Sequence, residues 1–182
     1  MSFSCTLYRI SEFVFHELEA GSITSQDMLT KSKDFVTVQD SGDAILFLLR
    51  KRSDQHGSTF INEIFSPTEK IGGLSDEAFE KLVESFNYKE IDKISASTFY
   101  YLPPHKIAAL NSFFRNLDHA EISLLYDANE LNSKNIYPSL WTSGEDYQQA
   151  YNLFHLKSDI ESLKNIFKNA DKENDYLLVF AG

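Results

Sequence analysis

The side chains of this chain that could do acid–base or metal chemistry are spread along the sequence. Five histidines occur, at positions 16, 56, 105, 119 and 155, and no two of them are three or four residues apart, so no helical face carries a histidine pair. The single cysteine, Cys5, excludes a site built from several thiolates. Glu145 and Asp146 are adjacent acids, but acids at the beginning of a helix commonly complement its dipole. We therefore predict no catalytic residue and no metal site.

Two acidic segments resemble calcium-binding loops only in their first positions. Segment 127–138 begins with Asp, but its sixth residue is Asn132 instead of Gly and its twelfth is Pro138 instead of Glu. Segment 171–176 has alternating acids, yet Tyr176 stands where the loop requires Gly. Both segments fail the requirements of an EF-hand loop.

Motifs that bind phosphates or cofactors are also missing from the sequence. Gly72-Gly73 lacks the further glycines and the Lys-Ser/Thr pair of a phosphate-binding loop, so we predict a turn there. The sequence contains no Gly-x-Ser-x-Gly nucleophile motif. His155 stands between Phe154 and Leu156, a setting that favours a half-buried, hydrogen-bonded histidine over a ligand. We expect no cofactor.

The 182 residues carry a formal net charge of −10. Proteins that bind nucleic acids draw much of their affinity from basic side chains that neutralise phosphates. The densest basic run is Arg50-Lys51-Arg52, which we place at the C-terminal end of a helix, where cations complement the helix dipole. Nucleic acid is therefore not expected as a direct partner.

Half of the negative charge lies between Leu117 and Asp146, where six acids and one base, Lys134, give a charge of −5. The acids are Asp118, Glu121, Asp127, Glu130, Glu145 and Asp146. Such a segment can simply form a solvated surface that keeps a protein soluble. It can also steer a basic partner and raise its association rate by ~10–1000-fold. Both interpretations remain open at this point.

Tyr137 and Trp141, the latter the only tryptophan, flank Pro138 just before the end of the acidic segment. Tyr and Trp are favoured at recognition surfaces because they combine apolar area with a polar group. The same properties suit them to anchoring a loop to the core of their own domain. We expect core anchors, with recognition residues as the alternative.

Two hypotheses of function follow. The first is a non-catalytic protein-binding module, such as an immunity or antitoxin-like protein that neutralises a basic toxin domain through its acidic surface. Its candidate contact residues are the six acids of the segment together with Tyr137 and Trp141. The alternative is a small-molecule-binding protein or undocumented enzyme. Its pocket would be lined by Tyr100, Tyr137, Trp141 and Tyr147.

Alternating and apolar runs predict the strands that would position these residues. Phe3, Cys5 and Leu7 alternate with polar neighbours and indicate an N-terminal strand, with Cys5 buried. Residues 34–38 favour a short strand, and the aromatic and β-branched segment 98–102 favours another. Segment 176–180 is apolar on both faces, which is typical of an interior strand.

Periodic apolar residues predict several amphipathic helices. One follows Ser11 with Phe13, Val14 and Leu18 inward, and others cover 43–52, the region after Ser75, the region after Pro103-Pro104 and 121–126. Their apolar stripes include Phe79, Leu82, Val83 and Phe86, and Ile107, Leu110, Phe114 and Leu117. Further on, one stripe comprises Tyr147, Ala150, Tyr151 and Phe154, and another Ile160, Leu163, Phe167 and Ala170. These two are out of phase near His155, which predicts a kink or two helices.

The chain is therefore expected to form a single α+β domain over residues 1–182, with a small mixed or antiparallel sheet packed against several amphipathic helices. The N-terminus lacks the basic and apolar stretches of a secretory signal. The longest apolar run, residues 44–49, is far shorter than the ~20 residues of a membrane span. We expect a soluble cytoplasmic protein; the sequence leaves its oligomeric state open.

Several motifs resemble the YfbM-like family of bacterial proteins, a domain-of-unknown-function family numbered 1877. The segment Ile136-Tyr137-Pro138-x-x-Trp141, the segment 152–157 and the closing apolar strand are similar to the C-terminal signature of that family. Residues 43–49 and 101–104 resemble its helix ending in Leu-Leu and its strand-to-helix junction. The resemblance implies an α+β fold and a bacterial origin, and it implies no enzymatic activity and no catalytic residues.

Overall fold

The computed structural model describes residues 4–56, 60–74, 76–84 and 98–181. Within this part of the chain, one five-stranded sheet has the strand order β2-β1-β5-β4-β3. The strands are β1 Ser4–Ile10, β2 Asp34–Gln39, β3 Glu69–Ile71, β4 Phe99–Leu102 and β5 Tyr176–Ala181. All four pairings are antiparallel. The fold is α+β, and the sheet is antiparallel rather than mixed.

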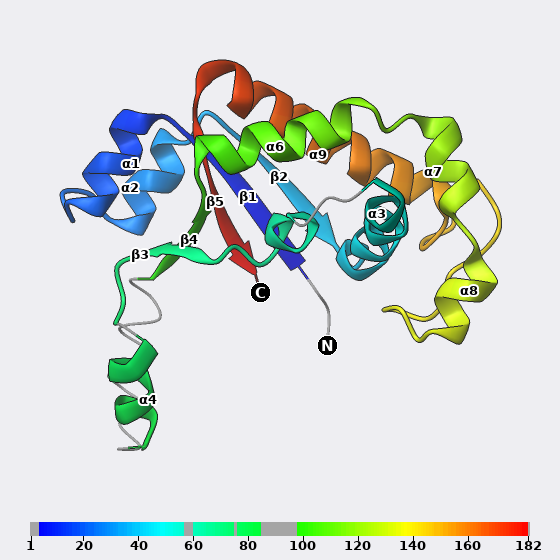
Figure 1. Cartoon of the computed structure of the whole chain (residues 1–182), viewed down its shortest axis with the longest axis horizontal. Coiled ribbons are helices and arrows are strands. Elements are labelled where there is room, and N and C mark those ends of the chain that lie inside the picture. Colours follow the sequence, from blue (N-terminus) through cyan, green and yellow to red (C-terminus); the bar gives the residue numbers. More distant parts are fainter. Residues whose placement is uncertain (1–3, 57–59, 75, 85–97, 182) are drawn as a thin grey trace.

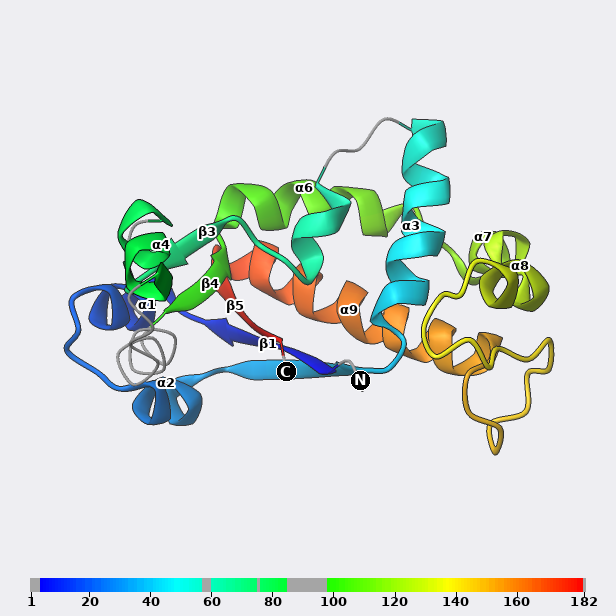
Figure 2. The same cartoon turned by 90° about the horizontal axis from the view of Figure 1, so that it is seen from below.

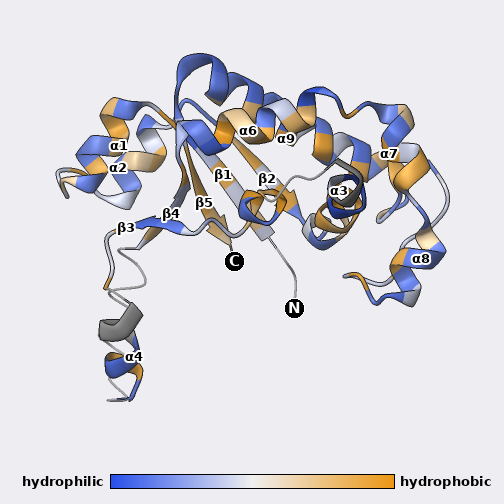
Figure 3. Ribbon diagram, in the orientation of Figure 1, coloured by the Kyte–Doolittle hydropathy of each residue, from blue (hydrophilic) through white to orange (hydrophobic). Residues whose placement is uncertain are grey.

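Strand β5 is the middle strand of the sheet, between β1 and β4 (Figure 1). Leu177 and Val179 belong to the core on one face, while Leu178 belongs to the core on the other face. Figure 3 shows β5 as hydrophobic along its length. A strand buried on both faces needs apolar residues at successive positions, so the prediction of an interior strand is confirmed. Strand β3 was not predicted, because three residues carry too little periodicity.

The helices lie mainly on one face of the sheet, where α3, α6 and α9 pack over β1, β2 and β5 (Figures 1 and 2). The helices are α1 Glu12–Glu19, α2 Ser25–Lys31, α3 Gly42–His56, α4 Asp76–Glu84, α6 Pro104–Arg115, α7 His119–Leu125, α8 Ala128–Ser133 and α9 Leu153–Glu173, with a 3-10 turn at Ile61–Ile64. On the other face, α1 and α2 enclose a smaller core around Ile10, Phe15 and Met28. None of the described helices combines the length and the apolar composition that crossing a membrane requires.

Helix α9 begins later than predicted. The side-chain oxygen of Asn152 accepts a hydrogen bond from His155 N, which makes Asn152 the N-cap. Its Nδ2 donates to the carbonyl oxygens of Asp146 and Gln149, so the preceding residues are held in turns. The prediction of a helical stripe of Tyr147, Ala150, Tyr151 and Phe154 is therefore wrong for its first three residues, because a side-chain cap competes with helix continuation there, and Phe154, which does lie in α9, is 46% exposed.

The second stripe of α9 is confirmed, since Ile160, Leu163, Phe167 and Ala170 are all buried. The helix ends at Asn174, whose left-handed φ of 54° suits a C-cap. Helix α9 is thus a single helix of 21 residues. It brings its N-terminal half beside the β2–α3 junction and its C-terminal half beside α6.

Three further predictions need correction or completion. Ser11 caps α1 as expected, but Phe13 is 69% exposed, and Phe15 takes its place beside Val14 and Leu18. Helix α3 extends to His56, so the basic run at 50–52 is not at its C-terminal end.

Helix α4 is present, with Val83 46% exposed; Phe86 and Phe3 lie outside the described residues. The buried stripe of α6 and the buried Cys5 are confirmed.

Candidate functional site

The acids of segment 117–146 were the first candidates for a partner-binding surface. Two of them are N-cap residues of helices. Asp118 accepts a hydrogen bond from Glu121 N at 2.7 Å and caps α7. Asp127 accepts from Asn129 N at 2.9 Å and from Glu130 N at 3.2 Å, and it caps α8. Capping a helix is a structural use of a carboxylate. The role of Asp127 also explains why a helix, α8, follows it.

Two more acids are paired with the basic run of α3. Arg52 Nε donates to Glu121 at 2.8 Å, and its side chain is only 7% exposed. Lys51 Nζ donates to Glu130 at 2.6 Å. The run at 50–52 therefore holds α7 and α8 against α3, and it does not complement the α3 dipole. These pairs neutralise part of the charge on which the docking hypothesis depends.

The last two acids of the segment lie in the loop before α9. Glu145 accepts from Lys157 Nζ at 3.1 Å, and Asp146 accepts from Gln148 N at 2.9 Å. Each of the six acids thus has its own local partner within the described residues. Their role in binding a partner stays a prediction, and the structure gathers them at the end of the molecule formed by α7, α8 and this loop (Figure 2).

Trp141 is a core residue, with 4% of its surface exposed. Its Nε1 donates to Ile136 O at 3.0 Å, and its backbone N–H and C=O are both bound by the side chain of Asn132. Its ring meets Tyr151 edge-on at 6.0 Å. Trp141 therefore anchors the 136–152 loop, as expected, and in this position its ring is not available to a docking partner. Tyr137, which precedes Trp141 in the same loop, is half-buried.

The four aromatic residues predicted to line one pocket do not come together. Tyr100 lines a cavity beside Phe65 and Pro67, on another part of the sheet. Tyr147 is 67% exposed. Trp141 alone of the four lines a cavity beside the N-terminal half of α9. The predicted pocket does not form because Tyr147 lies in a loop instead of on a helix, and because Tyr100 lies on β4.

We name this last space the α9 cavity. It has a volume of about 260 Å³. Its walls come from the end of β2 and the turn into α3, from the 136–152 loop and from α9. The lining residues used below are Asp40, Ser41, Trp141, Tyr151, His155 and Asp159. Residues that carry two aromatic rings, two carboxylates, a hydroxyl and an imidazole thus line one small space.

Asp159 and Ser41 form the polar floor of the α9 cavity. Ser41 Oγ donates to Asp159 Oδ2 at 2.5 Å, across 118 positions of sequence. Ser41 is 5% exposed and stands immediately before α3. Burial raises the pKa of Asp159 above its ordinary value of 3.8, although the Ser41 hydrogen bond and the nearby His155 oppose the rise. Among the described residues, no Lys or Arg forms an ion pair with Asp159.

His155 is half-buried and hydrogen-bonded, as predicted. Its Nδ1 donates to Asn152 Oδ1 at 3.0 Å. The Ser41 hydroxyl is bound to Asp159, and no hydrogen bond joins it to His155 in the part of the chain described. The geometry therefore differs from a serine–histidine nucleophile pair, in which the histidine accepts the serine proton.

The backbone is strained on two sides of the α9 cavity. Asp40 has a φ of 60°, and Tyr151 has a φ of 57°. Asp often adopts this left-handed region, but a bulky aromatic residue rarely does. Tyr137, which hydrogen-bonds to Asp40, has its pKa raised by desolvation and by the Asp40 carboxylate. Strained residues of this kind concentrate at binding and catalytic sites.

Sequence reasoning missed Ser41, Asp40 and Asp159. Asp159 precedes Ile160 of the buried α9 stripe, and an acid beside such a stripe was the only signal present. Only the packing of α9 against β2 brings Asp159 to Ser41. No group of three or more described His, Cys, Asp or Glu residues is arranged to hold a metal ion.

Comparison with known proteins places the chain in a family. The family model described as a domain of unknown function (DUF1877) matches residues 1–180. The crystal structure of YfbM from Escherichia coli, described as a protein of unknown function, superposes with a TM-score of 0.58 at 14% identity and covers 98% of this chain and 99% of that one. No curated protein matches. The fold of this chain is therefore that of YfbM, and the chain belongs to the DUF1877 family.

Proposed function

We propose that the protein binds a small cationic molecule in the α9 cavity. The observation that carries the proposal is Asp159, a half-buried residue of the cavity lining whose carboxylate has a hydroxyl group as its hydrogen-bond partner. Burying a carboxylate without a cation is unfavourable, and this cost is what raises its pKa. A ligand carrying an ammonium or guanidinium group would supply the opposite charge.

The walls of the cavity suit the same class of ligand. Tyr151 and Trp141 are among the lining residues, and cations are attracted to aromatic faces by ~0.5–2 kcal/mol. Asp40 adds a second carboxylate on the rim, and it already accepts the Tyr137 hydroxyl. The volume of about 260 Å³ admits a compact head group and excludes a large cofactor.

The single tryptophan gives a direct measurement of binding, because Trp141 lines the cavity. Choline and agmatine would be titrated into the protein while Trp141 fluorescence is followed, with 3,3-dimethylbutanol as the neutral analogue of choline. We expect a saturable change with at least one of the cations and none with the neutral alcohol. The Asp159→Asn variant should weaken binding by about tenfold or more, since a hydrogen bond to a charged group contributes ~1.5–3 kcal/mol.

The matched control is Glu145→Gln, which removes one negative charge from the neighbouring loop outside the cavity lining. It should bind the cation as the wild type does. Equal losses in Asp159→Asn and Glu145→Gln would mean that general electrostatics attract the probe. That result, or the absence of a saturable change with both cations, would refute the proposal.

A second candidate function is the docking of a basic protein, for instance a toxin domain, on the acidic end of the molecule. One observation favours it beyond net charge. Leu124 on α7 and Leu140 in the 136–152 loop after α8 are 86% and 66% exposed, and both lie within the acidic segment. Apolar side chains surrounded by charges are typical of recognition surfaces.

This candidate predicts that one partner protein, captured by the wild type from the cells that make it, is lost from a Leu124→Ser, Leu140→Ser double variant. The partner should be basic, and its association rate should fall as salt concentration rises. Glu121 and Glu130 are unsuitable for this test, because reversing either charge would also break its pair with α3. Equal capture by both proteins would contradict the idea.

A further inference from the structure

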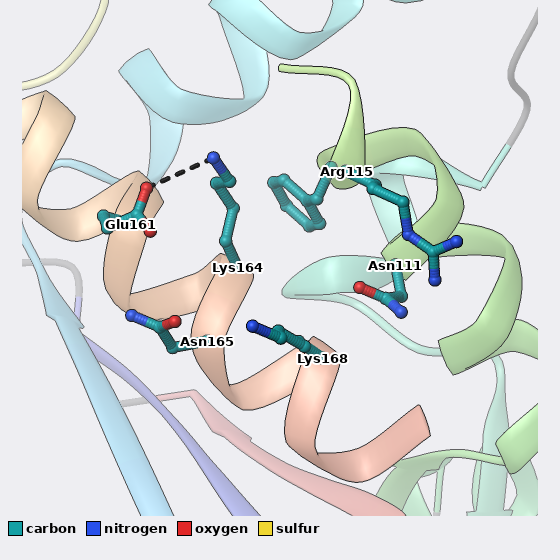
Figure 4. A pocket seen from close by; sticks show the side chains of 7 residues that line it. Asn111, Arg115, Glu161, Lys164, Asn165 and Lys168 are labelled. Atoms are coloured by element: carbon teal, nitrogen blue, oxygen red, sulfur yellow. Dashed lines mark ion pairs between the residues drawn. The ribbon is translucent and has the colours of Figure 1, made fainter. Parts of the chain in front are cut away.

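A second concave surface lies where α9 packs beside α6 (Figure 4). We name it the α6–α9 groove. Its volume is about 510 Å³, and the buried ring of Phe114 forms part of its floor. Its other lining residues are polar or charged, and they come from one face of each helix.

Three of these residues are cations. Lys164 and Lys168 are four positions apart on α9, so they share a helical face, and Arg115 lies in the last turn of α6. Among the described residues of the lining, Glu161 is the one acid. The lining therefore carries a formal charge of +2, three cations less one acid, in a chain whose net charge is −10. A local reversal of charge is unexpected on a surface that is acidic overall.

The cations differ in what they already contact. Lys164 Nζ donates to Leu117 O at 2.9 Å and lies 3.2 Å from Glu161, so it fixes the end of α6 against α9. Glu161 also lies 3.6 Å from His119. Arg115 and Lys168 are exposed and form no ion pair with any residue that the structure describes. Two of the three charges are thus free to meet a ligand.

Amide side chains complete the walls. Asn111 is 5% exposed, and its Nδ2 donates to Asp171 Oδ2 at 2.6 Å, which fixes the wall on the α6 side. Asn165, exposed between Lys164 and Lys168 in sequence, offers a neutral N–H donor. Figure 4 shows Asn111 and Arg115 on the α6 wall and Lys164, Asn165 and Lys168 on the α9 wall.

We propose that the α6–α9 groove binds a small phosphate-bearing molecule. The guanidinium fork of Arg115 matches the spacing of phosphate oxygens, and Lys168 supplies a compact second charge from the facing helix. The volume of the groove exceeds that of a phosphate group alone, so the molecule would carry a further polar part beside Asn165. This ligand is opposite in charge to the one proposed for the α9 cavity, and it occupies a separate site.

Calorimetric titration with inorganic pyrophosphate tests the proposal, with citrate as a multiply charged anion that lacks phosphorus. We expect pyrophosphate to bind and citrate to bind more weakly. Lys168→Gln should weaken pyrophosphate binding by about tenfold, and the double variant with Arg115→Gln should weaken it further. Both side chains are exposed, so neither substitution should alter the fold, which circular dichroism would verify.

Lys172→Gln is the matched control, because it removes the same charge one turn further along α9, outside the groove. It should leave pyrophosphate binding unchanged at 0.15 M salt, where distant charges are screened. Equal losses in Lys168→Gln and Lys172→Gln would show that only diffuse charge attracts the anion, and would overturn the proposal. No binding of pyrophosphate, or tighter binding of citrate, would also overturn it.

Discussion

Two carboxylates, Asp175 and Asp159, lie near opposite ends of α9, and they differ in the groups that contact their oxygens. Asp175, just after the helix, is 2% exposed. Lys33 Nζ donates to its two oxygens at 2.9 and 3.0 Å, and Arg9 approaches at 3.4 Å. Arg9 pairs with Asp34 at this end of the β1–β2 ladder, and Lys33 immediately precedes Asp34. The charge of Asp175 is therefore compensated within the protein.

Asp159 is less buried, yet it has a hydroxyl group where Asp175 has two cations. Burial raises the pKa of Asp159, and no Lys or Arg among the described residues forms an ion pair with it. A buried acid is therefore not by itself a sign of function. The better candidate for a functional group is an acid that lines a cavity and has no Lys or Arg partner.

The largest effect expected from this comparison is on stability. Asp175→Ala should lower the free energy of unfolding by about 3 kcal/mol, because Arg9, whose side chain is 11% exposed, would lose its closest buried partner. Chemical denaturation monitored by circular dichroism would measure the change. Glu173→Ala, which removes a 47% exposed partner of the same two cations, should cost less than ~1 kcal/mol. Similar losses in the two variants would contradict the assigned role of Asp175.

The next effect is a dependence of stability on pH that Asp159 should confer. A carboxyl whose pKa is higher in the folded than in the unfolded state binds more protons when folded, so it lowers stability as pH rises. Relative to Asp159→Asn, the wild type should therefore lose stability from pH 3.8 up to the raised pKa and then level off. Unfolding of both proteins across this range measures the difference. A difference that grows in the other direction would show that Asp159 is stabilised in its charged form.

The smallest effect is expected at the exposed pair between Glu145 and Lys157. Glu145 is 58% exposed in its side chain, and exposed ion pairs contribute ~0–1 kcal/mol. Glu145→Gln should therefore change the midpoint of denaturation very little, and any change should vanish at high salt. A large loss of stability would show that the 136–152 loop depends on this pair rather than on Trp141 and Asn152.

Much of the fold could be predicted from local patterns. The strands at β1, β2, β4 and β5, the central place of β5 and the buried stripes of α6 and the C-terminal part of α9 follow from alternation and helical periodicity. The errors fell where side chains compete with the backbone. Asn152 caps α9 and ends the apparent stripe before it, and Asp127 caps α8 where the sequence suggested only an incomplete calcium loop.

The candidate sites could not be predicted in the same way. Ser41 and Asp159 are 118 positions apart, and Arg115 and Lys168 belong to helices whose packing no local pattern specifies. The acids predicted to form a docking surface were identified from charge alone. Their pairing with Lys51 and Arg52 depends on how α7 and α8 approach α3.

The sequence by itself determined most of the strands and the longer helices, which residues are apolar enough to be buried, and that the molecule is acidic. These properties depend on neighbours within a few positions. Tertiary structure alone decided which charges are compensated, because a carboxylate is matched or left unmatched by groups from distant segments. Asp175 received two cations from the β1–β2 edge, whereas Asp159 received a hydroxyl group and an open cavity.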